Sequence, residues 1–192
     1  MLVVEGAIPT SDSGKYCYVW DEGGRAVTMA EAVRSLAAQA KFIVAVGTCA
    51  SFGGIPAAYA QTRTMGVGSF LGRPVLNLPG CPAHPDWVLG TLVQVLGGSI
   101  PALDAYNRPV IFYTPKVIHE RCPRREREEA SRFGQPGRCL EELGCKGPRS
   151  HADCDLRGWN NKQSWCIGAD PLCIGCTEPN FPAFPLHGEG DD

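Results

Sequence analysis

The chain has 192 residues, of which 44% are hydrophobic, and a formal net charge of -2 from 18 lysines and arginines against 20 acidic residues. This near balance gives no reason to expect a nucleic-acid partner or binding to an anionic membrane surface. The best apolar stretch, 88–100, contains Gln94 and the pair Gly97–Gly98. It is too short to cross a bilayer, so the sequence predicts no membrane span.

Three short apolar runs are typical of buried strands. They are Leu2–Val4, 42–46 and 74–78, and each is bounded by glycine or proline. Because helical patterns alternate with these runs, the order of elements predicts an α/β fold with a doubly wound parallel sheet.

Two predicted helices have recognisable ends. Thr28 and Glu31 form a capping box that begins the first helix. Pro85 suits the first turn of the second helix, which runs from Trp87 to Leu96 and stops at a glycine. One face of the first helix is expected to hold Ala32, Leu36 and Ala40.

The chain changes character near Thr114. The remainder is rich in cysteine and charge, and it follows neither the strand nor the helix period. We therefore predict two domains, 1–114 with the sheet and 115–192 with irregular structure.

The second domain holds a series of metal-ligand residues. Cysteine sulfur is a good ligand for zinc and for iron-sulfur clusters, and both remain open on spacing alone. A disulfide framework is less favoured, because the chain is long for a small secreted protein and opens without a signal peptide. Ordinary buried thiols can explain one or two of the cysteines but not the whole series. The series provides enough ligands for two sites: His119, Cys122, Cys139, Cys145, Cys154, Cys166, Cys173 and Cys176.

Two further cysteines follow predicted strands. Cys49 lies in the glycine-rich segment 47–54, and Cys81 lies in 78–84. Because parallel strands bring such segments together at the carboxyl edge of a sheet, the two thiols are expected to be neighbours. The alternative is that both segments are tight turns with incidental thiols.

Six segments carry motifs in a characteristic order: 4–9 (VEGAIP), 47–49 (GTC), 77–87 (NLPGCPAHPDW), 118–125 (IHERCPRR), 143–148 (LGCKGP) and 173–179 (CIGCTEP). Together they closely resemble the small, electron-transferring subunit of nickel-iron hydrogenases, nearly end to end. The resemblance implies a flavodoxin-like domain followed by an irregular iron-sulfur domain. It also implies three clusters in a line that leads outward from the nickel-iron site of the large subunit.

The resemblance further implies ligand sets for the two outer clusters. The outermost is a 4Fe-4S cluster with one imidazole ligand. For the middle cluster, Cys166 stands where many members have proline and a 3Fe-4S cluster, so a fourth thiolate favours 4Fe-4S; the alternative is a spare buried thiol. The outer set is His119, Cys122, Cys139 and Cys145, and the middle set is Cys154, Cys166, Cys173 and Cys176.

The inner cluster is where the sequence departs from the family pattern. The family holds it with a Cys-x2-Cys pair after the first strand and with two later cysteines that match Cys49 and Cys81. The upstream pair is not in this sequence, so we expect the first strand to be missing and the inner site to be incomplete. Cys17 is the nearest spare thiol and is expected to be an ordinary buried cysteine.

By resemblance, the chain relays electrons between the H2-activating site of a large subunit and an external redox partner, and it has no catalytic residue of its own. A cytoplasmic location, or membrane association through partners, is expected. Two alternatives stay open: the related iron-sulfur subunit of respiratory complex I, which keeps only the inner cluster, and a zinc-stabilised interaction module without a redox role. Charges that suit docking of an acidic redox partner, or that are simply solvated, are Lys116, Arg121, Arg124 and Arg125.

The remaining histidines and two tryptophans receive secondary roles. His84 suits a helix cap at least as well as proton transfer, whereas His151 and His187 have no motif around them. None of the three is assigned to catalysis. Trp159 and Trp165 are expected to pack around the middle cluster and keep it dry.

Overall fold

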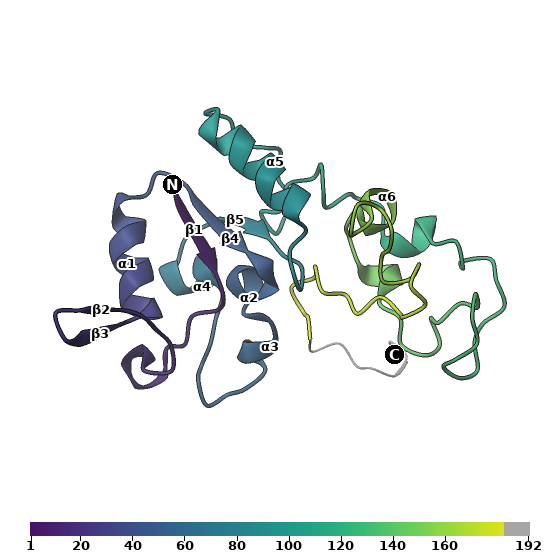
Figure 1. The fold of residues 1–192 in the computed structure, drawn as a ribbon, viewed down its shortest axis with the longest axis horizontal. Helices are drawn as coiled ribbons and strands as arrows, with labels where there is room; N and C mark the ends of the chain where they lie inside the picture. Colours follow the sequence, from purple (N-terminus) through teal and green to yellow (C-terminus); the bar gives the residue numbers. More distant parts are fainter. Residues whose placement is uncertain (183–192) are drawn as a thin grey trace. The chain divides into compact units, whose positions relative to one another are not determined.

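The computed structural model describes residues 1–182, and the chain divides into two compact units, Met1–Pro109 and a second that begins at Val110 (Figure 1). The first unit contains a three-stranded parallel sheet in the order β1-β4-β5. Its strands are β1 (Leu2–Glu5), β4 (Ile43–Val46) and β5 (Leu76–Leu78). The sheet is parallel and has helices beside it, as an α/β fold requires.

The burial of the strands follows their place in the sheet. β4 is central, and Ile43, Val44 and Ala45 are all buried, which is the pattern of a parallel strand covered on both faces. β1 pairs only with β4 among the described strands, with Leu2 opposite Ile43, and its Val3 side chain is 44% exposed. The three predicted strands therefore exist, each within two residues of its expected bounds.

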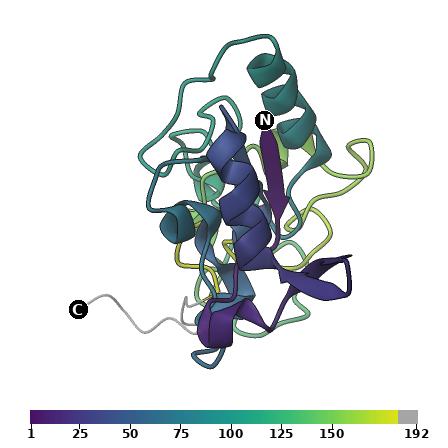
Figure 2. The same cartoon turned by 90° about the vertical axis from the view of Figure 1, so that its left-hand side faces the viewer.

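Helix α1 (Met29–Gln39) begins at the predicted capping box. Thr28 Oγ1 accepts the Glu31 backbone N–H at 3.2 Å, and the Glu31 carboxylate accepts the Thr28 N–H at 3.0 Å. α1 lies beside β1 in both Figure 1 and Figure 2, and it contributes Ala30, Val33 and Ala37 to the core. The expectation that Leu36 shares a core face with Ala32 is wrong: Leu36 lies to one side of the buried stripe and is 46% exposed.

A hairpin that the sequence patterns did not predict precedes α1. Strands β2 (Tyr18–Glu22) and β3 (Arg25–Thr28) pair antiparallel and project away from the unit (Figures 1 and 2). Gly23 and Gly24 join them with φ of 61° and 85°, the left-handed conformation that a tight hairpin turn requires. Every residue of β2 is exposed, so the strand lacks the alternation by which half-buried strands are recognised.

The other elements of the first unit are helical. The segment after β4, expected to be a loop, is instead the short helix α2 (Gly47–Phe52), so Cys49 lies in a helical turn. The predicted second helix is confirmed as α5 (Pro85–Leu96), and Trp87 on it is fully buried. The remaining short elements are η1 (Ser11–Gly14), α3 (Gly54–Ala57) and α4 (Val67–Leu71).

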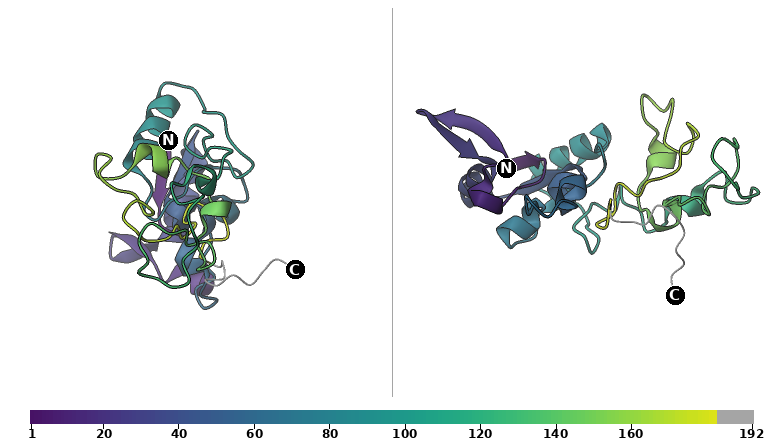
Figure 3. Two further views of the ribbon diagram at one scale, coloured as in Figure 1. Left: turned by 90° about the vertical axis from the view of Figure 1, so that its right-hand side faces the viewer. Right: turned by 90° about the horizontal axis from the view of Figure 1, so that it is seen from below.

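The second unit has little regular structure. Its described helices are η2 (Ile118–Arg121), η3 (Gly147–Arg149) and α6 (Cys154–Arg157), each a single turn, and Figure 3 shows loops between them. Specific side-chain and turn hydrogen bonds must therefore hold its ligand residues in place. Across residues 1–182, no helix combines the length and the apolarity needed to span a membrane.

Candidate metal centres

The four residues of the predicted outer set line a single pocket in the second unit. His119 comes from η2, Cys122 directly follows η2, and Cys139 and Cys145 flank a tight turn. The pocket wall is mainly apolar, with Leu140, Ile167, Pro171 and Leu172. Donors of two chemical types thus converge on one mainly apolar pocket, which is the arrangement a cluster or a metal ion with one imidazole ligand needs.

Backbone hydrogen bonds hold the outer ligands. Cys139 donates its N–H to the Glu128 carbonyl at 3.0 Å, and its own carbonyl accepts the Ala130 N–H at 2.8 Å. The Arg124 N–H lies 3.4 Å from Cys122 Sγ, so a backbone dipole is directed at a ligand sulfur. Such N–H···S contacts stabilise negative charge on sulfur and are one of the ways a protein tunes a metal site.

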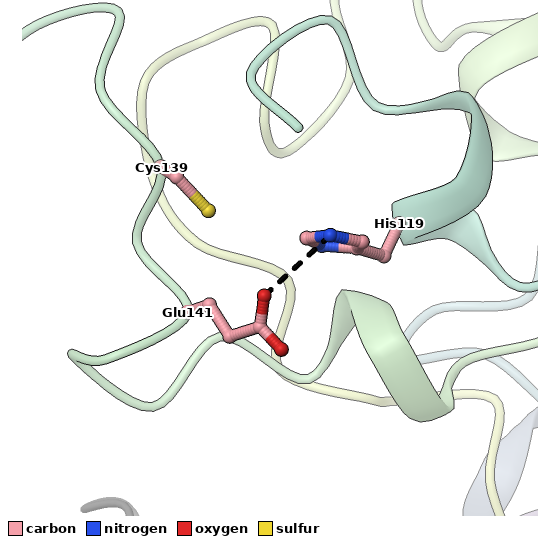
Figure 4. A group of neighbouring side chains, drawn as sticks. All are labelled: His119, Cys139 and Glu141. Atoms are coloured by element: carbon pink, nitrogen blue, oxygen red, sulfur yellow. Dashed lines mark ion pairs between the residues drawn. The ribbon is translucent and has the colours of Figure 1, made fainter. Parts of the chain in front are cut away.

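A carboxylate that the sequence analysis missed accompanies His119. Glu141 Oε2 lies 3.5 Å from His119 Nε2, and the ligand atoms of His119, Cys139 and Glu141 are all within 4.8 Å of one another (Figure 4). With Nε2 directed at Glu141, the other ring nitrogen remains for a metal. The only sequence signal was an acidic residue between two ligand cysteines.

The four thiols of the predicted middle set line a second pocket. Cys154 begins α6, Cys166 lies in the loop beyond it, and Cys173 and Cys176 belong to one turn-rich segment. Burial raises the pKa of Cys154 well above its usual range and that of Cys173 to about 11. Both thiols are therefore neutral at pH 7 without a metal, and a metal must displace their protons to bind.

Apolar side chains enclose this second pocket, which is consistent with a site kept dry. Ile118, Trp165, Ile167 and Ile174 line it, and Ile167 lines the outer pocket as well. Of the two tryptophans expected here, Trp165 is among the lining residues and Trp159 is not.

Cys49 and Cys81 are neighbours at the carboxyl edge of the sheet, as expected. Their segments are joined by two hydrogen bonds, from the Thr48 N–H to the Gly80 carbonyl (3.1 Å) and from the Gly80 N–H to Thr48 Oγ1 (2.8 Å). Burial raises the pKa of Cys49, and the nearby Cys81 raises it further. Cys17 is half-buried between η1 and β2.

The arginines next to Cys122 are not available for docking. Arg121 and Arg124 are committed to ion pairs within the unit, with Asp155 at 2.6 Å and Asp170 at 2.7 Å respectively. Lys116 and Arg125 are exposed. Only these two of the four expected docking charges face solvent.

The other histidines take structural positions. His84 caps α5, and its Nδ1 accepts the Asp86 N–H at 3.1 Å, which confirms the expected cap. His151 lies beside Glu178, which accepts the His151 backbone N–H at 2.6 Å. His187 lies outside the described residues.

Family models match segments of both units. A family model for the C-terminal region of NiFe/NiFeSe hydrogenase small subunits matches residues 114–186, and one described as "NADH ubiquinone oxidoreductase, 20 Kd subunit" matches residues 1–95. A solved structure of the reduced, active nickel-iron-selenium hydrogenase from Desulfomicrobium baculatum superposes with a TM-score of 0.86 at 45% identity, over 95% of this chain and 72% of that one. The chain belongs to the small-subunit family of NiFe and NiFeSe hydrogenases. The resemblance drawn from its motifs is thereby confirmed.

Two curated relatives show how much of a longer protein the chain matches. The chain is 45% identical to the periplasmic [NiFeSe] hydrogenase small subunit of Desulfomicrobium baculatum, over 94% of this chain and 64% of that relative. It is 39% identical to the F420 non-reducing hydrogenase II small subunit of Methanosarcina mazei, over 100% of this chain and 57% of that relative. The chain thus spans less than two thirds of the length of these curated relatives.

Proposed function

We propose that this chain is the electron-transfer small subunit of a nickel-iron hydrogenase. It relays electrons between the H2-activating centre of a large subunit and an external redox partner, and the bond chemistry of H2 takes place in the large subunit. The observation that carries the proposal is the pair of pockets in the second unit, each lined by one complete predicted set of four ligands. The relatives, named as small subunits of hydrogenases, support the same role.

The domain assignment follows from this role. We assign 1–114 to a flavodoxin-like domain and 115–192 to a cluster-binding domain. The parallel sheet with its helices supports the first assignment, and the family model that begins at residue 114 supports the second.

The donor chemistry of the outer pocket fits a 4Fe-4S cluster held by His119, Cys122, Cys139 and Cys145. When bound, the cluster supplies a one-electron carrier. Imidazole is neutral, so His119 leaves the site one negative charge short of an all-thiolate site and favours the reduced state. Leu140 and the other apolar lining residues exclude water.

The middle pocket fits a 4Fe-4S cluster held by four thiolates, because Cys166 lines it together with Cys154, Cys173 and Cys176. At the inner site the chain contributes Cys49 and Cys81, which are adjacent but supply only two of the ligands a cluster requires.

The ligand assignment is tested on the complex with the large subunit, produced by co-expression and purified without oxygen. Iron, acid-labile sulfide and zinc are measured, and electron paramagnetic resonance (EPR) spectra are recorded. We expect Cys166→Ser to convert a four-iron signal into a three-iron signal and to lower the iron content, whereas Cys17→Ser leaves both unchanged. Zinc without sulfide would overturn the cluster assignment, and a chain that never co-purifies with a large subunit would overturn the partner.

A protein similar to the iron-sulfur subunit of complex I is the second candidate, since the corresponding family model matches residues 1–95. The two ligand sets of the second unit favour the hydrogenase function, because the complex I subunit keeps only the inner cluster. The expected location, cytoplasmic or membrane-associated through partners, remains a prediction, and the Desulfomicrobium relative is named periplasmic.

A further inference from the structure

The Arg121 side chain is one of the links between the backbone segments of the two pockets in the second unit, and the Arg124 side chain, which bonds the Ile167 carbonyl and Asp170, is another. The Arg121 guanidinium donates to both Asp155 oxygens, from Nε to Oδ2 at 2.6 Å and from Nη2 to Oδ1 at 2.8 Å. It also donates to the carbonyls of Ala152 (2.7 Å) and Lys116 (3.2 Å) and to Thr114 Oγ1 (3.2 Å). Each of its five N–H groups therefore has an acceptor, so the guanidinium is held in one orientation.

Each residue of this pair is adjacent in sequence to a ligand of a different pocket. Arg121 is the residue before Cys122, an outer ligand, and Asp155 is the residue after Cys154, a middle ligand. The ion pair therefore joins η2 to α6, and each of these elements carries a ligand for a different pocket. The contact between the two ligand-bearing segments is therefore direct, through the Arg121–Asp155 ion pair.

The pair is also shielded from solvent and geometrically stiff. The side chains of Arg121 and Asp155 are only 18% and 6% exposed. A two-point arginine–carboxylate contact fixes angle as well as distance, which a lysine cannot do. Because a buried ion pair is seldom a net source of stability compared with apolar packing, its value here is better sought in geometric specificity.

Geometry matters because the second unit has few regular elements to impose it. In a sheet or a long helix, a backbone ladder fixes the separation of two residues. Here the backbone supplies single hydrogen bonds, from the Ile118 N–H to the Ser150 carbonyl and from the Lys146 N–H to the Cys173 carbonyl (both 2.8 Å), so side-chain contacts must supplement them. Electron transfer between two carriers falls off exponentially with their separation, so a small displacement of one ligand segment slows it strongly.

We propose that Arg121 and Asp155 form a positioning pair that fixes the separation of the outer and middle clusters. The inference rests on the proposed function. With clusters bound in both pockets, the step it governs would be the passage of one electron between the middle and the outer site, with no bond made or broken. Neither residue contacts the reacting atoms; both act through the ligand segments they join.

The test uses the complete enzyme with its large subunit and compares Arg121→Lys and Asp155→Asn with the wild type. The matched control is Arg157→Lys, because the ion pair of Arg157 with Asp153, the N-cap residue of α6, has exposures of 25% and 7% and stays within one ligand-bearing segment. The Arg157 guanidinium also lies over the Phe112 ring, which belongs to neither ligand set. The main readout is the magnetic interaction between the outer and middle clusters in the EPR spectrum of the fully reduced enzyme. Iron and sulfide content are measured on the same samples.

We expect Arg121→Lys and Asp155→Asn to retain their iron and sulfide but to lose the wild-type splitting, and Arg157→Lys to keep it. Fully loaded variants of both residues with the wild-type splitting would overturn the positioning role and leave the proposed function intact. A wild-type complex without iron and sulfide would overturn the proposed function and, with it, the inference. If one variant lacks iron and sulfide, the splitting of the other variant tests the proposal, because the two substitutions remove the same ion pair from opposite partners.

Discussion

A methyl group at Gly54 would test how tightly the first unit holds the Cys49 thiol. Gly54 begins α3 with φ of +54°, in the left-handed region. A Cβ placed there would lie 2.9 Å from Cys49 Sγ, 3.0 Å from its backbone nitrogen and 3.1 Å from its Cα. Two of these three atoms belong to the backbone of α2, so the overlap cannot be relieved by rotating a side chain.

The cost of Gly54→Ala has two parts. The left-handed conformation disfavours a residue with a Cβ by about 1–2 kcal/mol. Overpacking against a fixed neighbour adds about 1–3 kcal/mol, so the expected loss in the free energy of unfolding is about 2–5 kcal/mol. Gly72→Ala is the matched control: Gly72 has φ of +64°, but a Cβ there meets nothing within 4 Å. It should lose only the first part, about 1–2 kcal/mol.

Urea unfolding of the two variants and the wild type measures both losses. A second measurement is the rate at which iodoacetamide alkylates Cys49 in the iron-free chain, located by mass spectrometry. We expect Gly54→Ala to have the lower midpoint of the two variants and to be alone in changing the Cys49 rate. Losses in the free energy of unfolding that agree within about 0.5 kcal/mol, together with equal alkylation rates, would show that Cys49 is not held against Gly54.

Three further expectations follow from the caps, thiols and carboxylates described above. Thr28→Ala removes the N-cap bond of α1 and should lower the free energy of unfolding by about 1 kcal/mol in urea, whereas a loss near zero would contradict the cap. Because burial raises the pKa of Cys173 to about 11 from 9.0, the folded iron-free chain binds more protons than the unfolded chain above pH 9. The stability of the folded iron-free chain should therefore fall as the pH rises from 9 toward 11. Urea midpoints that do not fall over that range would refute the raised pKa of Cys173. Glu141→Gln removes a negative charge beside His119 and should raise the midpoint potential of the outer site in an EPR-monitored redox titration. The control is Glu142→Gln, at an exposed position. Equal shifts in the two variants would show that the Glu141 carboxylate has no specific effect on the outer site.

The sequence predicts those parts of the fold that local chemistry decides. The start of α1 follows from Thr28 and Glu31, and α5 follows from Pro85 and the glycine beyond Leu96, because caps act within a few residues. The resemblance to the hydrogenase small-subunit family supplied the two ligand sets, and in the structure each set of four lines one pocket.

What the sequence did not predict depends on contacts between distant residues or on exposed surface. Strand β2 of the hairpin is exposed throughout, and β3 buries only the consecutive residues Val27 and Thr28, so neither strand alternates; α2 lies in a glycine-rich run that favours a loop. The pair of Arg121 and Asp155 spans 34 positions and leaves no periodic trace. Such contacts form only when segments far apart in the sequence pack together, so no local pattern predicts them.

The scarcity of regular structure in the second unit bears on how a cell handles this protein. Apart from η2, η3 and α6, the described part of the unit is loop, and its thiols line two pockets, where burial raises the pKa of Cys154 and Cys173. Binding energy at such sites is folding energy, and an unfilled unit opens readily to proteases. On the proposed function, with iron-sulfur clusters in these pockets, iron supply would set the abundance of the subunit: cells starved of iron would degrade it rather than store it empty.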